Sequence, residues 1–145
     1  MAETQQPAAP AETPAAAGAD GGRGRVIVVG YSPKPEGRAA LARALAEARA
    51  RAAEVVVVHT ATDGEVADLR SELLSSGVPF EIKEAADALD PAEDLITTAD
   101  SRAAEFIVIG LRKRSPVGKL LLGSNAQRVL LDAACPVLAV KAEPV

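Results

Sequence analysis

Four β-branched residues in a row, Val26-Ile27-Val28-Val29, lead into Gly30-Tyr31-Ser32. Both faces of a strand built from these residues are apolar, which is typical of a central strand in a parallel sheet covered by helices on both sides. Similar apolar runs follow at residues 55–58 and 106–109. The sequence therefore predicts three buried parallel strands, and its other segments can be placed around them.

Helices are predicted after the first two runs. Apolar residues at helical spacing give the first helix a buried face made of Leu41, Ala42, Leu45, Ala48 and Ala52. The second helix starts at a capping box formed by Thr62 and Glu65, and Gly77 ends it. Its expected buried stripe consists of Val66, Leu69 and Leu73.

Two more helices have clear start signals. Asp90 as a cap and Pro91 in the first turn predict the start of the third helix. Ser124 and Gln127 have the spacing of a capping box and predict the start of the fourth. The buried residues expected on these helices are Leu95, Ile96, Ala99 and Ala103 on the third, and Val129, Leu130 and Ala133 on the fourth.

Two further strands complete the pattern. Residues 78–83 alternate between apolar and polar and include Pro79, which indicates an edge strand. Pro136 introduces a last strand at 137–140. Alternating strands and helices imply a parallel sheet, and right-handed crossovers with one chain reversal give the order 3-2-1-4-5. We therefore expect an α/β fold over residues 25–145, with a doubly wound five-stranded parallel sheet and helices on both faces.

Residues 1–24 differ from the rest of the chain. They contain no Val, Ile, Leu or aromatic residue. Nothing in this segment can be buried to offset the entropy of ordering it. We predict a disordered tail that precedes the domain.

The composition excludes several classes of protein. A net charge of −4 argues against nucleic-acid binding, which usually needs a basic face. The apolar stretches are too short for a membrane span. The single cysteine, Cys135, allows no internal disulfide and favours a reducing compartment, so we expect a cytoplasmic protein. We expect Cys135 to be a small buried hydrophobic residue, with a redox sensor as the alternative.

Ligands of doubly wound sheets bind at the carboxyl ends of the strands, where the strand order reverses. Here the loops after Val29 and Ile109 are expected to meet at that point. The segment after Ile109 has no acidic residue before Asp132, and its basic residues are Arg112, Lys113, Arg114, Lys119 and Arg128. A helix start at Gly123-Ser124-Asn125 offers free backbone N–H groups to a phosphate. The alternative is a turn glycine, a serine cap that bonds the Gln127 amide, and an ordinary solvated basic loop.

This segment resembles the ATP-binding signature of the universal stress protein family, which is Gly-x-x-Gly, nine residues, and then Gly-Ser/Thr. Gly110, Gly123 and Ser124 match at the right spacing, and Asn125 matches the residue often found next. The segments 26–30, 55–59 and 135–140 also resemble the family. The resemblance covers residues 25 to about 141. It implies ATP as the cofactor, with Mg²⁺ as its accompanying ion, and a role in stress response through a partner surface that the nucleotide biases.

Two positions depart from the family pattern. Lys113 stands where the family has its second glycine, and Gly30 stands where the family often has an Asp that holds the ribose or adenine side. The residues expected to bind the nucleotide are Gly30, Tyr31, Ser32, Gly110, Arg112, Lys113, Gly123, Ser124 and Asn125. The alternative is a dimeric regulatory module of the same fold that binds no nucleotide, which Gly30 and Lys113 favour.

The resemblance also implies a homodimer, in which strand 137–140 pairs with its copy across a two-fold axis and covers an apolar edge. A further protein partner, of unknown identity, would read the nucleotide state. We expect no catalytic residue, no metal site, and at most weak ATP hydrolysis. His59 is the single histidine and ends a buried strand, which favours a packing role, and one His with one Cys cannot build a zinc site. Asp63, Asp87 and Asp90 are expected to be helix caps or turn residues.

Overall fold

The computed structural model describes residues 24–85, 90–111 and 123–142. The expected tail at 1–24 lies outside these ranges except for Gly24, so its disorder stays a prediction. The elements run in the order β2 (Val26–Tyr31), α1 (Pro35–Arg51), β3 (Glu54–His59), α2 (Asp63–Ser76), β4 (Phe80–Glu84), α3 (Pro91–Ser101), β5 (Phe106–Leu111), α4 (Ser124–Asp132) and β6 (Val137–Lys141). Strands and helices alternate as predicted.

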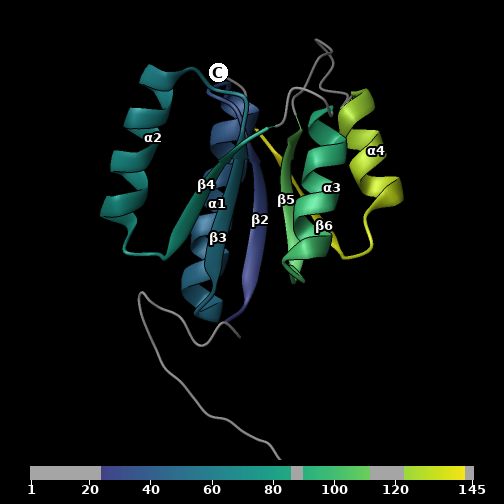
Figure 1. The fold of residues 1–145 in the computed structure, drawn as a ribbon, viewed down its shortest axis with the longest axis horizontal. Coiled ribbons are helices and arrows are strands. Elements are labelled where there is room, and N and C mark those ends of the chain that lie inside the picture. The colour runs from purple at the N-terminus through teal and green to yellow at the C-terminus, as the bar shows by residue number, and fades with distance from the viewer. Residues whose placement is uncertain (1–23, 86–89, 112–122, 143–145) are drawn as a thin grey trace, which may run out of the picture.

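The five strands form one sheet in the order β4-β3-β2-β5-β6, with every neighbouring pair parallel (Figure 1). This confirms the expected α/β fold and the order 3-2-1-4-5. The strand order reverses between β2 and β5, which pair with Val28 opposite Ile107. On the other side of β2, Gly30 lies opposite Val58 and Tyr31 opposite His59. The ends of β2, β3 and β5 therefore lie together at one edge of the sheet.

Helices cover both faces of the sheet (Figure 1). Alternate residues of β2 enter different core clusters: Ile27 and Val29 pack with α1 and α2, whereas Val26 and Val28 pack with α3 and α4. All four of these side chains are buried. This two-sided burial explains why the strand reads as a continuous apolar run.

The helix starts follow the predicted signals in two of three cases. Thr62 and Glu65 form the expected capping box of α2, and the hydrogen bond from the Thr62 backbone N–H lowers the pKa of Glu65. Asp90 caps α3 by accepting from the backbone N–H of Glu93 at 2.8 Å. The capping box predicted for α4 is wrong. Gly123 is the N-cap, and its carbonyl oxygen accepts from the backbone N–H of Gln127 at 3.0 Å.

Several predicted core positions are exposed instead. Ala42 faces solvent, because the buried stripe of α1 runs through Ala40 and Ala44. Ala52 and Ala103 lie just beyond their helices with φ of 55° and 52°, so the chain turns away from the core there. On α4, Val129 is buried, whereas Leu130 is 39% exposed because the helix turns it outward. The helical pattern alone did not show that Ala42 and Leu130 face solvent, or that α1 and α3 end before Ala52 and Ala103.

Candidate functional site

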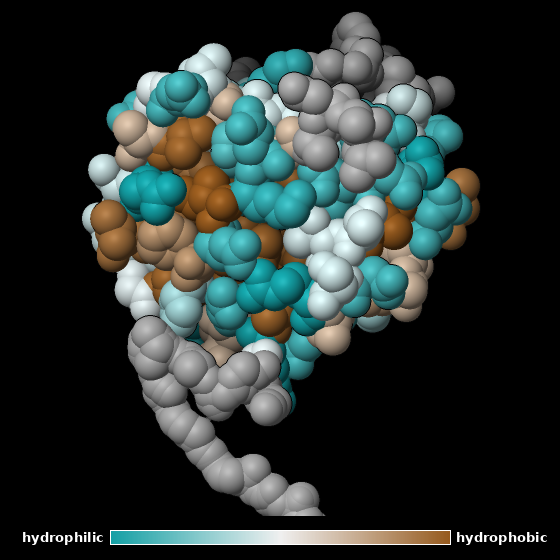
Figure 2. Space-filling model, viewed as in Figure 1, coloured by the Kyte–Doolittle hydropathy of each residue, from teal (hydrophilic) through white to brown (hydrophobic). Residues whose placement is uncertain are grey.

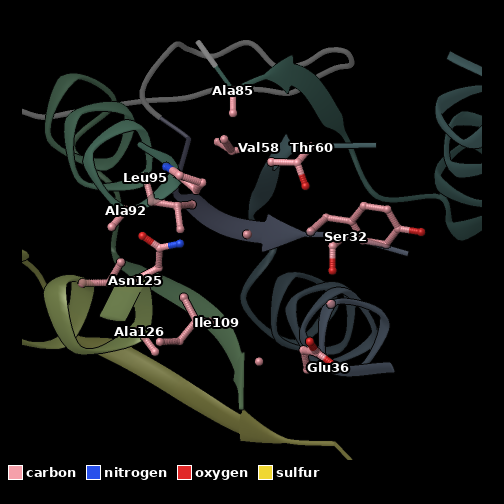
Figure 3. A pocket seen from close by; sticks show the side chains of 16 residues that line it. Ser32, Glu36, Val58, Thr60, Ala85, Ala92, Leu95, Ile109, Asn125 and Ala126 are labelled. Atoms are coloured by element: carbon pink, nitrogen blue, oxygen red, sulfur yellow. The ribbon is translucent and has the colours of Figure 1, made fainter. Parts of the chain in front are cut away.

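A cavity of about 240 Å³ opens where the strand order reverses. The ends of β2, β3 and β5 form one side of it, and the first turns of α1, α3 and α4 surround the rest (Figure 3). This is the place where doubly wound sheets bind ligands, because the loops on either side of the reversal separate there. The structure therefore has a cavity at the place where the sequence predicts a ligand site.

The inner part of the cavity is apolar. It is lined by Val58, Ala92, Leu95, Ile109, Ala126 and Val129. Most of these side chains belong to the core cluster shared with α3 and α4, so the cavity continues directly into the core. An apolar lining of this kind is typical of small-molecule sites and suits an apolar part of a ligand.

Polar groups lie around the apolar part. Ser32 and Glu36 stand on the α1 side, Thr60 follows β3, and Asn125 comes from the first turn of α4. Figure 3 shows the Asn125 amide pointing into the space between Leu95 and Ile109. A few convergent polar groups over an apolar floor can fix the orientation of a ligand.

Two glycines let α1 approach the sheet closely. A Cβ atom at Gly110 would overlap with the backbone carbonyl of Glu36, and one at Gly37 would overlap with the backbone of Ser32. Both contacts involve main-chain atoms, which cannot move aside cheaply. Gly110, expected at a phosphate site, therefore also has a packing role that the sequence did not reveal.

Two other glycines differ in the room that surrounds them. No described atom lies within 4 Å of the place that a Cβ at Gly123 would take. A Cβ at Gly30 would lie 3.0 Å from Cδ1 of Leu95. Gly123 therefore borders open space at the start of α4, whereas the space above Gly30 already holds a leucine.

The structure brings part of the predicted site together. Gly30, Ser32, Gly110 and Asn125 all line the cavity. Gly123 and Ser124 are exposed at the start of α4, directly before Asn125. Arg112 and Lys113 lie outside the described residues. The binding role of all these residues stays a prediction.

Tyr31 contributes differently from its neighbours. It borders the cavity, but its side chain packs in the core cluster beneath α1 and α2. Its hydroxyl accepts from Nη1 of Arg38 at 3.4 Å. Because successive residues of a strand point to opposite faces, Tyr31 offers its backbone to the cavity while its ring belongs to the other side.

Arg128 does not add to the positive field that the sequence suggested. Its guanidinium bonds Asp90 at 3.1 Å, Asp132 at 3.2 Å, and also Glu93. The charge of Glu93, followed by the hydrogen bond with Asp132, raises the pKa of Arg128. Arg128 therefore ties α4 to the start of α3, and its charge is compensated by these carboxylates.

His59 and Cys135 fit structural roles. His59 is buried at the end of β3, and its Nδ1 accepts from the backbone N–H of Ala61 at 3.1 Å. This agrees with the expected hydrogen-bonded packing role. Cys135 is partly buried against the core, and burial raises the pKa of its thiol. A raised pKa keeps the thiol protonated and less reactive near neutral pH.

Sequence reasoning missed several cavity residues. Thr60 directly follows β3, so the rule that ligands bind at the carboxyl ends of strands could have indicated it. Glu36 and Leu95 gave no such signal, because their placement depends on how α1 and α3 cross the sheet. Only the packed structure shows them at the cavity.

The cavity is small for a whole drug-sized ligand. Its 240 Å³ is below the roughly 300–1,000 Å³ of pockets that enclose drug-sized ligands, so a ligand of that size would extend past the mouth. The start of α4 lies there and presents backbone N–H groups. Within the described ranges, no group of three or more His, Cys, Asp or Glu side chains is arranged to hold a metal ion. In the same ranges, no helix is long and apolar enough to cross a membrane.

Comparison with known proteins gives one consistent family. The model of the universal stress protein family matches residues 65–141. A universal stress protein of Mycolicibacterium smegmatis is 57% identical over 81 residues, which are 56% of this chain and 62% of that protein, so the match spans less than two thirds of that relative.

Solved structures extend the similarity to nearly the whole fold. A universal stress protein of Archaeoglobus fulgidus is 34% identical with a TM-score of 0.64, covering 81% of this chain and 98% of the other. A structure of the universal stress protein from the same organism in complex with dAMP is 28% identical with a TM-score of 0.59, over 81% and 98% of the two chains. The chain therefore belongs to the universal stress protein family.

Proposed function

We propose that this protein binds an adenine nucleotide in the cavity between the ends of β2 and β5, and that this nucleotide is ATP. The observation that carries the proposal is this cavity, with its apolar floor and the start of α4 at its mouth. The dAMP complex of the Archaeoglobus relative supports the class of ligand. Bound nucleotide would bias a partner surface in a cytoplasmic stress response.

The two ends of the nucleotide have matching surroundings. The base would lie against the apolar floor formed by Val58, Leu95 and Val129. The phosphates would lie near the first turn of α4, where N–H groups have no intrahelical partner and the helix dipole is positive. Because Gly123 rather than Ser124 caps this helix, the Ser124 hydroxyl is not used by the cap. The proposal gives this hydroxyl the role of a donor to a phosphate.

The direct test is to look for nucleotide in the purified protein. Acid release followed by chromatography should yield an adenine nucleotide, and calorimetry of the emptied protein should rank ATP, ADP and AMP. Higher affinity for ATP than for AMP would support the triphosphate as the ligand. Protein that carries no nucleotide and gives no heat with any of the three would contradict the proposal.

A second candidate function is a dimeric regulatory module of the same fold without nucleotide. Gly30 favours it, because the residue that replaces the family's frequent Asp has no side chain, and Leu95 packs over it. Lys113 separates the two functions. If its ammonium contacts a phosphate, Lys113→Ala should weaken ATP binding about tenfold, the value of one charged hydrogen bond. If Lys113 obstructs the site, Lys113→Gly should improve binding instead.

We also propose that the protein is a homodimer through strand 137–140. β6 ends the sheet order, so no strand of the described residues pairs with its outer edge, where a second copy of the chain would add one. Figure 2 shows apolar residues at the lateral edge over α4, the helix that precedes β6, and Leu131 of that helix is 81% exposed. Leu138→Lys should shift the sedimenting species from dimer to monomer, with circular dichroism as the check on folding. A wild type that sediments as a monomer at micromolar concentration would contradict the dimer.

A further inference from the structure

Leu95 lies at the inner end of the cavity. Three residues of α3 line the cavity, namely Pro91, Ala92 and Leu95. Pro91 begins the helix at the carboxyl edge of the sheet, and Leu95 is four residues further along, about 6 Å deeper at 1.5 Å per residue. Its side chain points into the cavity and is only 7% exposed (Figure 3). Leu95 therefore forms part of the floor.

The position of Leu95 depends on Gly30. The place of a Cβ at Gly30 lies 3.0 Å from Cδ1 of Leu95, 3.5 Å from Cδ2 and 3.7 Å from Cγ. A Cβ at 3.0 Å is closer than ordinary van der Waals contact, so a side chain at position 30 would require the end of the Leu95 side chain to shift by a few tenths of an ångström. Leu95 thus packs directly over the end of β2, in contact with the place that a side chain at residue 30 would take.

We propose that Leu95, held over Gly30, sets the size of the base that the cavity accepts. This inference rests on the proposed function. It specifies the ligands as adenine nucleotides whose base carries no added substituent. Widening a floor of close-packed side chains costs free energy, because protein interiors have few voids and low compressibility. Removing methyl groups from residue 95 would deepen the floor and admit a larger ring system.

The experiment compares AMP with AMP analogues that carry one added alkyl group at C2, N6 or C8 of adenine. Testing three positions makes the result independent of how the base is oriented. The measured quantity is the ratio of analogue affinity to AMP affinity. For at least one analogue, this ratio should be about 10- to 200-fold higher in Leu95→Ala than in the wild type, which is the range for one methylene group in an apolar pocket. Leu95→Val should give a smaller change in the same direction.

A matched control separates size selection from general loosening of the core. Leu69 is a fully buried leucine in the core cluster on the opposite face of the sheet. Leu69→Ala removes the same atoms far from the cavity and should leave the ratio of analogue to AMP affinity unchanged. If Leu69→Ala changed this ratio as much as Leu95→Ala, the inference would be overturned.

A second variant tests the same contact without truncating the core. Gly30→Ala adds one methyl group beneath Leu95 and should lower AMP affinity, whereas Gly30→Ala combined with Leu95→Ala should restore it. If AMP binds the wild type and no analogue gains in either Leu95 variant, the size limit is wrong while the proposed function stands. If the wild type binds no nucleotide at all, the proposed function and the inference fail together.

Discussion

Gly110 at the end of β5 and Gly123 at the start of α4 belong to the same sequence signature but have different surroundings. A Cβ at Gly110 would overlap with the backbone of Glu36, whereas a Cβ at Gly123 would have no described atom within 4 Å. Both φ values lie outside the left-handed region, so neither glycine is required by its own backbone conformation. The difference is one of space: one glycine is needed for packing, and the other leaves a surface open.

This comparison shows that spacing alone does not assign a role to a glycine. Gly110 lets the first turn of α1 lie against the end of β5, and that contact forms one wall of the cavity. Gly123 borders solvent at the first turn of α4, where an anion could approach the backbone closely. A change at Gly110 should therefore affect folding first, and a change at Gly123 should affect binding first.

The largest expected effect is on stability in Gly110→Ala. The added methyl group would meet the main chain of α1 and force the helix away from the sheet. Overpacking of this kind should lower the free energy of unfolding by about 3 kcal/mol. For a domain of this size that corresponds to a melting temperature lower by roughly 10 °C, measured by calorimetry.

Gly64 provides the matched control for that substitution. It lies in the first turn of α2, and, in contrast to Gly110, a Cβ there would meet nothing within 4 Å among the described residues. Gly64→Ala should raise stability by about 0.4–1 kcal/mol, because alanine restricts the unfolded chain. Equal melting temperatures for the two variants would contradict the packing role of Gly110.

The next effect is on nucleotide binding in Gly123→Val. The branched side chain would occupy the space in front of the first N–H groups of α4 and should reduce ATP affinity at least a hundredfold. Stability should fall by less than about 1 kcal/mol, since only the N-cap preference changes. Calorimetry with ATP and a thermal melt measure both. Unchanged ATP affinity in a folded variant would place the phosphates elsewhere.

The frame of this site could be predicted well from the sequence. Apolar runs such as 26–29 indicated the strands, and the strand order then placed Gly30, Gly110 and Asn125 at one edge. These features depend on local patterns and on general rules of chain topology. The amino-acid sequence therefore suffices to place the cavity at the carboxyl ends of β2 and β5.

The inner surface of the site could not be predicted in the same way. Leu95 reads as an ordinary core residue of α3, and nothing local indicates that it extends over Gly30. Arg128 reads as one more cation in a basic segment, although it bonds Asp90 from a distant part of the chain. Such contacts depend on how helices pack across the sheet, which the spacing of residues along the chain does not encode.

A smaller effect is expected from Arg128→Met, which tests how firmly the start of α4 is held. The variant keeps the long side chain and removes the charged bonds to Asp90, Glu93 and Asp132. We expect a modestly lower melting temperature at low salt and little difference from the wild type at about 1 M salt, where the Debye length falls to roughly 3 Å. A difference that is the same at both salt concentrations would show that packing, rather than charge, ties α4 to α3.

The smallest effect on stability is expected from Ser124→Ala. In the predicted capping box this change would have cost about 1 kcal/mol, but Gly123 is the N-cap of α4, and the Ser124 side chain makes no cap hydrogen bond within the described residues. Stability should therefore change by less than about 0.5 kcal/mol, measured by urea denaturation. Thr62→Ala is the control, because Thr62 accepts from the backbone N–H of Glu65 in an actual capping box, and it should cost about 1 kcal/mol.

If the Ser124 hydroxyl contacts a phosphate, the same Ser124→Ala protein should bind ATP several-fold more weakly than the wild type. A loss of stability in Ser124→Ala equal to that in Thr62→Ala would instead show that Ser124 caps the helix in solution, and its hydroxyl would then not be free for a ligand.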